Sequence, residues 1–174
     1  MTKALVVIDA QQAMFRTPGY VPYEGEAVID RIASLIARAR DARVPIYFVQ
    51  HDEGPDGDLT PGKPGFPFVA KLTPRASDNV TVKHHGSAFH DTDLDAKLRK
   101  AGIDSLVICG MQSEYCVDAA VRSAKEHGYR VTLVADGHST FDTKILKAKD
   151  IVAHENETLN GSYAAVVPAA MIEF

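Results

Sequence analysis

The stretch Asp104-Ser-Leu-Val-Ile-Cys-Gly-Met-Gln-Ser-Glu-Tyr-Cys-Val-Asp118 predicts a buried strand, a short turn and the start of a helix. Residues 106–108 form an unbroken apolar run, which is typical of a parallel strand covered on both faces. Gly110 marks the expected end of the strand, and Ser113 can cap the helix that follows. Cys116 would lie in the first helical turn, where unpaired backbone N–H groups and the helix dipole favour a thiolate. This geometry suits a nucleophile.

Alternating apolar segments extend this unit in both directions along the chain. Strands alternating with helices, without an internal repeat, predict a doubly wound parallel sheet in a three-layer α/β/α fold. Loops are expected at residues 10–23 and 53–67, the second because it holds four glycines and four prolines. A loop of that length in a compact domain is expected to shape a pocket. Strands are predicted at 4–8, 44–49, 80–82, 104–109, 129–135 and 163–167, and helices at 25–43, 92–101, 113–127 and 143–157.

Length and composition narrow the class of protein. A chain of 174 residues with 45% hydrophobic content suits one domain spanning residues 1–174. The net charge of −4 favours neither nucleic acid nor an anionic membrane as a partner, so a small molecule is the expected ligand. The amino-terminal apolar run is too short for a signal peptide and is interrupted by Asp9, and no segment approaches the length of a membrane span. We expect a cytoplasmic protein.

Three reactive side chains follow predicted strands. Asp9, Lys83 and Cys116 each stand at or just past the carboxyl end of a different strand. Taken singly, they are commonly a turn residue, a solvated charge and an inert core thiol, respectively. In a doubly wound sheet, however, such strand ends can converge on one crevice. The other cysteine, Cys109, is interpreted as a small buried hydrophobe, and a structural disulfide is not expected.

Four segments of the sequence, taken together and in order, form a recognisable sequence pattern. They are residues 4–15 (Ala-Leu-Val-Val-Ile-Asp-Ala-Gln-Gln-Ala-Met-Phe), 83–94 (Lys-His-His-Gly-Ser-Ala-Phe-His-Asp-Thr-Asp-Leu), 109–117 (Cys-Gly-Met-Gln-Ser-Glu-Tyr-Cys-Val) and 128–136 (Gly-Tyr-Arg-Val-Thr-Leu-Val-Ala-Asp). In this order the chain resembles the isochorismatase-like cysteine hydrolases, which include nicotinamidases and other small amidases. The resemblance implies a Rossmann-like, six-stranded parallel sheet and a catalytic triad of Asp9, Lys83 and Cys116.

The chemistry of these residue types fits hydrolysis of an amide C–N bond through a Cys116 thioester. Asp9 would accept the thiol proton, and Lys83 would keep Asp9 ionised and favour the thiolate. The resemblance further nominates the backbone N–H groups of Gln112 and Cys116 as the oxyanion hole. It also implies a cis peptide bond between Met111 and Gln112.

The substrate is less clearly indicated. The resemblance places Phe15, Phe89 and Tyr115 around the pocket, where plain core packing is an equally good explanation, and His51 is a further candidate substrate-binding residue. Nicotinamidases of the family bind a metal through an Asp-x-His pair, but residues 48–53 read Phe-Val-Gln-His-Asp-Glu here and that pair is absent. We therefore expect no catalytic metal and no cofactor.

A second pair of histidines, at 84 and 85, is a poor candidate for a metal site. The adjacent His84 and His85 point in different directions in an extended segment, which makes them poor ligands for one ion. His90 and His138 are interpreted as surface or structural histidines.

Several alternatives stay open. Nicotinamidase is the less favoured amidase, and the isochorismatase reaction cleaves a vinyl ether without a cysteine nucleophile. A non-catalytic small-molecule-binding α/β domain is a third alternative. A nucleotide-binding oxidoreductase is set aside, because no Gly-x-Gly-x-x-Gly follows the first strand. Streptothricin-type lactams, ureido compounds and simple amides all fit as substrates. Open sheet edges and the resemblance favour a homo-oligomer, a dimer or larger.

Overall fold

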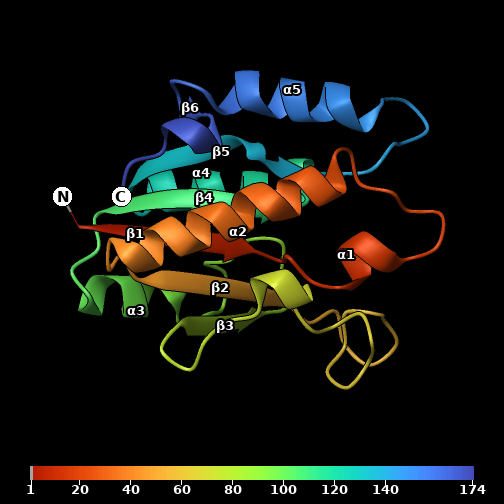
Figure 1. The fold of residues 1–174 in the computed structure, drawn as a ribbon, viewed down its shortest axis with the longest axis horizontal. Helices are drawn as coiled ribbons and strands as arrows, with labels where there is room; N and C mark the ends of the chain where they lie inside the picture. Colours follow the sequence, from red (N-terminus) through yellow and green to blue (C-terminus); the bar gives the residue numbers. More distant parts are fainter. Residues whose placement is uncertain (1) are drawn as a thin grey trace.

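Six parallel strands form the central layer of the protein in a computed structural model that describes residues 2–174 (Figure 1). Their order in the sheet is β3-β2-β1-β4-β5-β6, so the chain winds outward in opposite directions from β1 and β4. The carboxyl ends of these two strands therefore form the switch point at which doubly wound sheets bind ligands. The strands are β1 (Lys3–Ile8), β2 (Ile46–His51), β3 (Asn79–Lys83), β4 (Ser105–Met111), β5 (Arg130–Ser139) and β6 (Ala165–Val167).

Helices cover both faces of the sheet, which confirms the predicted three-layer α/β/α fold. Alternate residues of β1 point to opposite faces: Leu5 and Val7 pack with α2, whereas Val6 and Ile8 pack with α3 and α4. Helix α5 lies beside α4 and β5. Within residues 2–174, no helix combines the length and apolar character needed to span a bilayer. The main helices are α2 (Gly25–Asp41), α3 (Leu94–Lys100), α4 (Asp118–Glu126) and α5 (Ala148–Leu159).

The structure differs from the sequence prediction in a few segments. The loop expected at 10–23 contains a short helix, α1 (Ala13–Arg16), which is fastened where the Ala13 N–H donates to the Gly65 carbonyl. Helix α5 begins at Ala148, five residues later than predicted, because the preceding Thr143 and Asp142 form local turns instead. Residues 53–67 are a loop, as expected.

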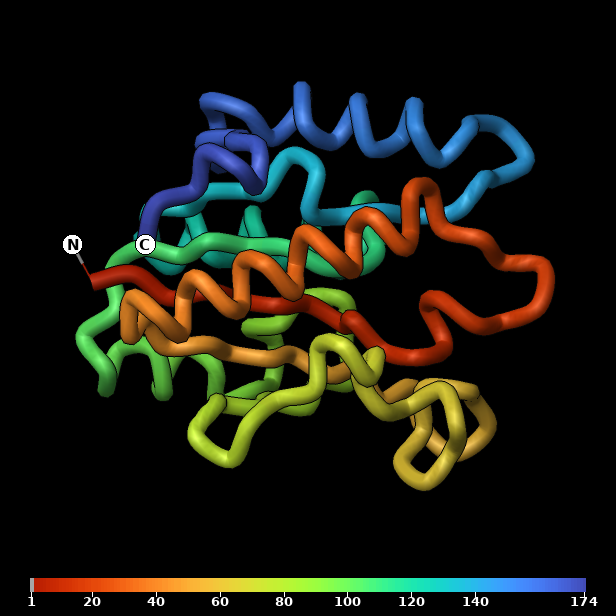
Figure 2. The backbone as a smooth tube through the Cα atoms, in the orientation of Figure 1, coloured from red at the N-terminus to blue at the C-terminus, as the bar shows by residue number. Residues whose placement is uncertain are grey.

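Loops and α1 gather at one end of the molecule. Figure 2 shows both chain termini at the opposite end, near the starts of the strands. The segment that holds α1, the loop 53–67 and the connection from β5 to α5 all lie at the carboxyl ends of the strands. Any ligand at the switch point therefore meets these loops first.

The contact between β1 and β4 depends on Gly110. The sequence predicts that strand β4 ends at this glycine, but the strand continues to Met111. Gly110 adopts a φ of +128°, and a Cβ there would lie 2.0 Å from the carbonyl oxygen of Ile8. Only glycine allows this conformation and this approach.

We expect Gly110→Ala to lower the free energy of unfolding by about 3 kcal/mol, since it adds backbone strain to a steric clash. Gly102→Ala is the matched control, because Gly102 also has a positive φ but its added Cβ would meet no atom within 4 Å. It should cost about 1 kcal/mol. Urea denaturation of both variants measures the difference, and equal losses would contradict the close approach at Ile8.

Candidate active site

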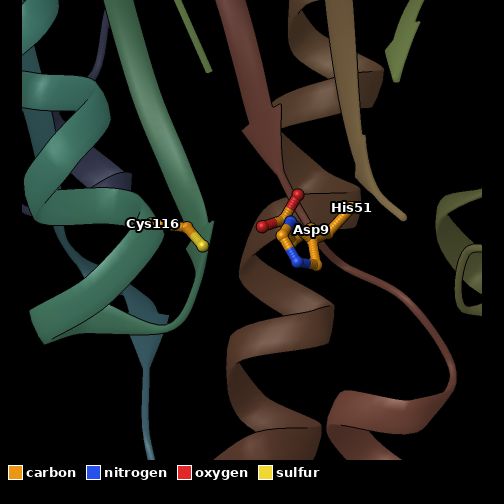
Figure 3. Close-up of side chains that lie close together, drawn as sticks. All are labelled: Asp9, His51 and Cys116. Carbon is orange, nitrogen blue, oxygen red and sulfur yellow. The ribbon is translucent and has the colours of Figure 1, made fainter. Parts of the chain in front are cut away.

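Asp9, Lys83 and Cys116 meet at the carboxyl edge of the sheet. Asp9 directly follows β1, Lys83 ends β3, and Cys116 lies in η2 (Ser113–Val117), the π-helical turn after β4. The Lys83 Nζ lies 2.8 Å from Asp9 Oδ2 and 3.1 Å from Cys116 Sγ. Figure 3 shows the sulfur of Cys116 pointing toward Asp9 and His51. The structure thus brings the three sequence-predicted residues into mutual contact.

The Lys83 ammonium has further partners at the site. Its Nζ donates to the His85 carbonyl at 3.0 Å and lies 2.9 Å from His51 Nδ1. Because an ammonium carries only donors, Nδ1 of His51 must accept, so neutral His51 carries its proton on Nε2. Burial and the positive charge of Lys83 both lower the pKa of His51. His51 is therefore neutral and can offer an N–H donor.

Asp9 is a buried carboxylate in an unusual conformation. It has a φ of +44° and no exposed surface. Apart from the ion pair with Lys83, neither oxygen accepts a hydrogen bond of regular geometry from the residues that the structure describes. Burial raises the pKa of Asp9, although the charge of Lys83 opposes this shift. A carboxylate with a raised pKa is a stronger base, which suits a proton acceptor.

The thiol of Cys116 keeps its proton in the resting protein. Burial and the neighbouring Asp9 raise the pKa of Cys116 to about 12, and Lys83 opposes this only in part. Burial thus outweighs the helix-start effect expected from the sequence, so deprotonation needs a nearby base. Cys109 is fully buried within β4, consistent with a small core residue, and burial raises its pKa to about 12 as well.

The turn that carries Cys116 has an irregular hydrogen-bond pattern. The Gln112 carbonyl accepts from the N–H groups of Tyr115 and Val117, the residues on either side of Cys116. The Met111–Gln112 peptide bond is cis, at the position that the resemblance implies. Ser113 does not cap the helix, contrary to prediction, because its hydroxyl bonds to His138 instead.

His138 joins this turn to β5 and α5 through a buried chain of hydrogen bonds. Asn156 Nδ2 donates to the Ala135 carbonyl at 2.9 Å, so its Oδ1 is left to accept from His138 Nε2 at 3.0 Å. The other ring nitrogen, Nδ1, then accepts from Ser113 Oγ at 2.8 Å. Sequence reasoning did not find this role, because neither Ser113 nor Asn156 is near His138 in the chain.

Gln11 fastens the loop 53–67 to the site. Its side-chain amide donates to the carbonyls of His51 and Phe66 and accepts from the His51 N–H. The buried Gln11 thus links the ends of β1 and β2 to the last part of the loop. This contact supports the prediction that the loop shapes the pocket. Sequence reasoning did not assign this role to Gln11, which appears there only as part of the segment 4–15.

The three predicted aromatic residues lie in different surroundings. Tyr115 is 59% exposed in the same turn as Cys116. Phe15, in α1, packs against the core on the α2 side. Phe89 stacks on His127, with ring centroids 5.0 Å apart, beyond the carboxyl end of α4. The structure thus places the Phe89 ring against His127, and its role in lining the pocket stays a prediction.

The site around Lys83 also contains a set of possible metal ligands. Ligand atoms of Asp9, His51 and Cys116 lie within 4.8 Å of one another. However, the Lys83 ammonium contacts all three of these residues, so a positive charge already holds the space between them. These residues therefore do not fit a cation while Lys83 is charged.

The sequence of this chain matches a known protein family. The Isochorismatase domain model matches residues 3–165. An isochorismatase family protein of Bacillus subtilis is 35% identical over 95% of this chain and 96% of its own length. The streptothricin hydrolase of Streptomyces noursei is 39% identical over 80% of this chain, and the match spans 50% of that hydrolase.

Solved structures agree with these matches. A putative isochorismatase-family hydrolase from Chromobacterium violaceum superposes with a TM-score of 0.92 at 31% identity, covering 97% of this chain and 90% of the other. The N-carbamoylsarcosine amidase of Thermoplasma acidophilum gives a TM-score of 0.83 at 25% identity, with both chains fully covered.

The buried His138 makes stability depend on pH. Burial lowers the pKa of His138, so the unfolded chain binds a proton more readily than the folded protein. The free energy of unfolding should therefore fall as the pH drops below about 6.5, by at most about 1.4 kcal/mol per pH unit for this residue. Urea unfolding at several pH values should show a shallower fall for His138→Gln. The exposed His154→Ala is the control, and a slope unchanged by His138→Gln would contradict the assignment.

Proposed function

This chain belongs to the isochorismatase family of hydrolases, and we propose that it is a cysteine hydrolase that cleaves the C–N bond of a small amide. One observation carries the proposal: the Lys83 ammonium lies within 3.1 Å of both a carboxylate oxygen of Asp9 and the Cys116 sulfur. Nucleophilic catalysis by cysteine needs a base and a positive charge beside the thiol. The similarity to a streptothricin hydrolase and to an N-carbamoylsarcosine amidase supports a C–N bond as the target.

The first step forms a covalent bond between Cys116 Sγ and the carbonyl carbon of the substrate. As this bond forms, the thiol proton moves to Asp9, whose pKa is raised by burial toward that of an effective base. The carbonyl oxygen gains a negative charge. The N–H groups of Gln112, which directly precedes η2, and of Cys116, within η2, are the proposed donors to it.

The second step breaks the C–N bond. Asp9 returns its proton to the nitrogen, which leaves as an amine or ammonia, and the acyl group stays on Cys116 as a thioester. Water then attacks the thioester and gives a proton to Asp9. When the C–S bond breaks, Asp9 reprotonates the sulfur and the product departs as a carboxylic acid. Lys83 keeps its charge throughout and stabilises the carboxylate and the developing thiolate in turn.

His51 is proposed to orient the substrate. Its Nδ1 accepts from Lys83, so the neutral ring can donate its Nε2–H to a substrate carbonyl or leaving group. The same contact disfavours the nicotinamidase alternative, since His51 would need to release Lys83 to serve as a metal ligand.

Replacement of the nucleophile gives the most direct test. Cys116→Ala should lower amide hydrolysis by at least about a thousandfold, because no other group can form the acyl intermediate. Ammonia release from ureido compounds and simple primary amides, and the appearance of the ring-opened amino acid from lactams, measure this. Cys109→Ala, the other cysteine, should leave turnover intact. Under native conditions iodoacetamide should label Cys116 rather than the fully buried Cys109. Activity that survives Cys116→Ala would rule out the nucleophile.

The role of Asp9 predicts an acidic limb in the pH profile of kcat/KM. Activity requires ionised Asp9, so it should fall as the pH drops through the pKa of Asp9, which burial raises above the ordinary value of 3.8. Asp9→Asn should lower kcat/KM by about a hundredfold or more and abolish this limb. Asp41→Asn, at the far end of α2, is the control. A limb unchanged in residual Asp9→Asn activity would assign it to another group.

A further inference from the structure

A second cluster of ligating side chains lies outside the site described above. The rings of His85 and His90 stack with centroids 4.1 Å apart. The Nε2 atom of each lies 3.6 Å from the same carboxylate oxygen, Oδ2 of Asp91. All three ligand atoms lie within 4.8 Å of one another. The fold thus gathers two imidazoles and one carboxylate from a segment of seven residues.

Two of these three separations are close to those in a metal site. Bonds of about 2.0–2.1 Å in a tetrahedral zinc site place the ligand atoms about 3.3–3.4 Å apart. The two nitrogen-to-oxygen distances of 3.6 Å exceed this by only a few tenths of an ångström. All three side chains are largely exposed, so small side-chain rotations can close the gap, and solvent can supply a fourth ligand.

The backbone of this segment is held in place without an ion. The His85 carbonyl accepts from Lys83 Nζ, the His90 N–H donates to the Ser87 carbonyl, and Thr92 Oγ1 donates to the Ala88 carbonyl at 2.6 Å. Ala88, at the centre of the turn, is fully buried. A ligand set on a fixed backbone loses less conformational entropy when an ion binds.

We propose that His85, His90 and Asp91 form a surface binding site for a divalent transition metal ion such as Zn²⁺, with water completing its coordination. Imidazole nitrogens and a carboxylate oxygen are ligands of the type that Zn²⁺, Co²⁺ and Ni²⁺ accept. The site is separate from the Asp9, His51 and Cys116 group, where the Lys83 ammonium occupies the centre. Through the His85 carbonyl, the ion would brace the backbone that holds Lys83.

Calorimetric titration with Zn²⁺, using Cys116→Ala protein as well as wild type, tests the site independently of catalysis. Both proteins should bind one ion per chain at this site. His90→Ala should weaken binding by at least about tenfold, since loss of even an outer-shell partner commonly costs that much. Asp91→Asn should also weaken it, and asparagine tolerates the φ of +52° at this position. His154→Ala, which removes an exposed histidine from α5, should bind as wild type does.

Visible absorption of the Co²⁺-substituted protein gives a second readout. The bands of bound Co²⁺ should appear in wild type and diminish in His90→Ala, while circular dichroism shows that both are folded. Three results would overturn the proposal: no binding of Zn²⁺ to wild type at millimolar concentration, equal affinity in wild type and His90→Ala, or loss of binding in Cys116→Ala. The last would place the ion in the active-site cluster. The first two outcomes do not bear on amide hydrolysis, so the metal site can fail while the proposed function stands.

Discussion

The buried ammonium of Lys83 is the interaction on which the site depends. A charge without exposed surface is costly unless it is paired and hydrogen-bonded, and Lys83 meets Asp9, His51, Cys116 and the His85 carbonyl. The strand order makes these contacts possible. Lys83 ends β3, two strand spacings of about 4.8 Å from β1, and its long side chain passes the end of β2 to reach Asp9. A shorter residue at this position would leave the carboxylate buried and unpaired.

The charges around the sulfur favour a protonated thiol until a substrate arrives. Burial and Asp9 both raise the pKa of Cys116, and the same burial raises the pKa of Asp9. Lys83 counteracts both shifts, because it stabilises either anion. The negative charge can therefore pass between carboxylate and sulfur with little change in its interaction with the ammonium. This sharing suits a reaction in which one proton moves back and forth between the same two groups.

Much of the fold and the triad could be predicted, because both follow local patterns. Apolar runs mark buried strands, and the three reactive residues stand where those runs end. Long-range contacts were harder. Ser113 looked like a helix cap, but His138 lies within reach only after β5 and α5 have packed against the turn. Phe89 follows Lys83 by six residues, yet its turn carries it to the far end of α4. The approach of Gly110 to Ile8 likewise depends on the pairing of β1 with β4.

The position of β3 in the sheet has a consequence for heat inactivation. β3 is an edge strand that pairs only with β2, and Val80 and Val82 on it are 39% and 43% exposed. Edge elements with few apolar contacts open locally at lower free energy than the core strands. Asp9 and Cys116 follow central strands, whereas Lys83 is the last residue of this edge strand. Fraying of one peripheral strand would therefore withdraw the ammonium while most of the molecule is still folded, and enzymatic competence would be lost before cooperative melting.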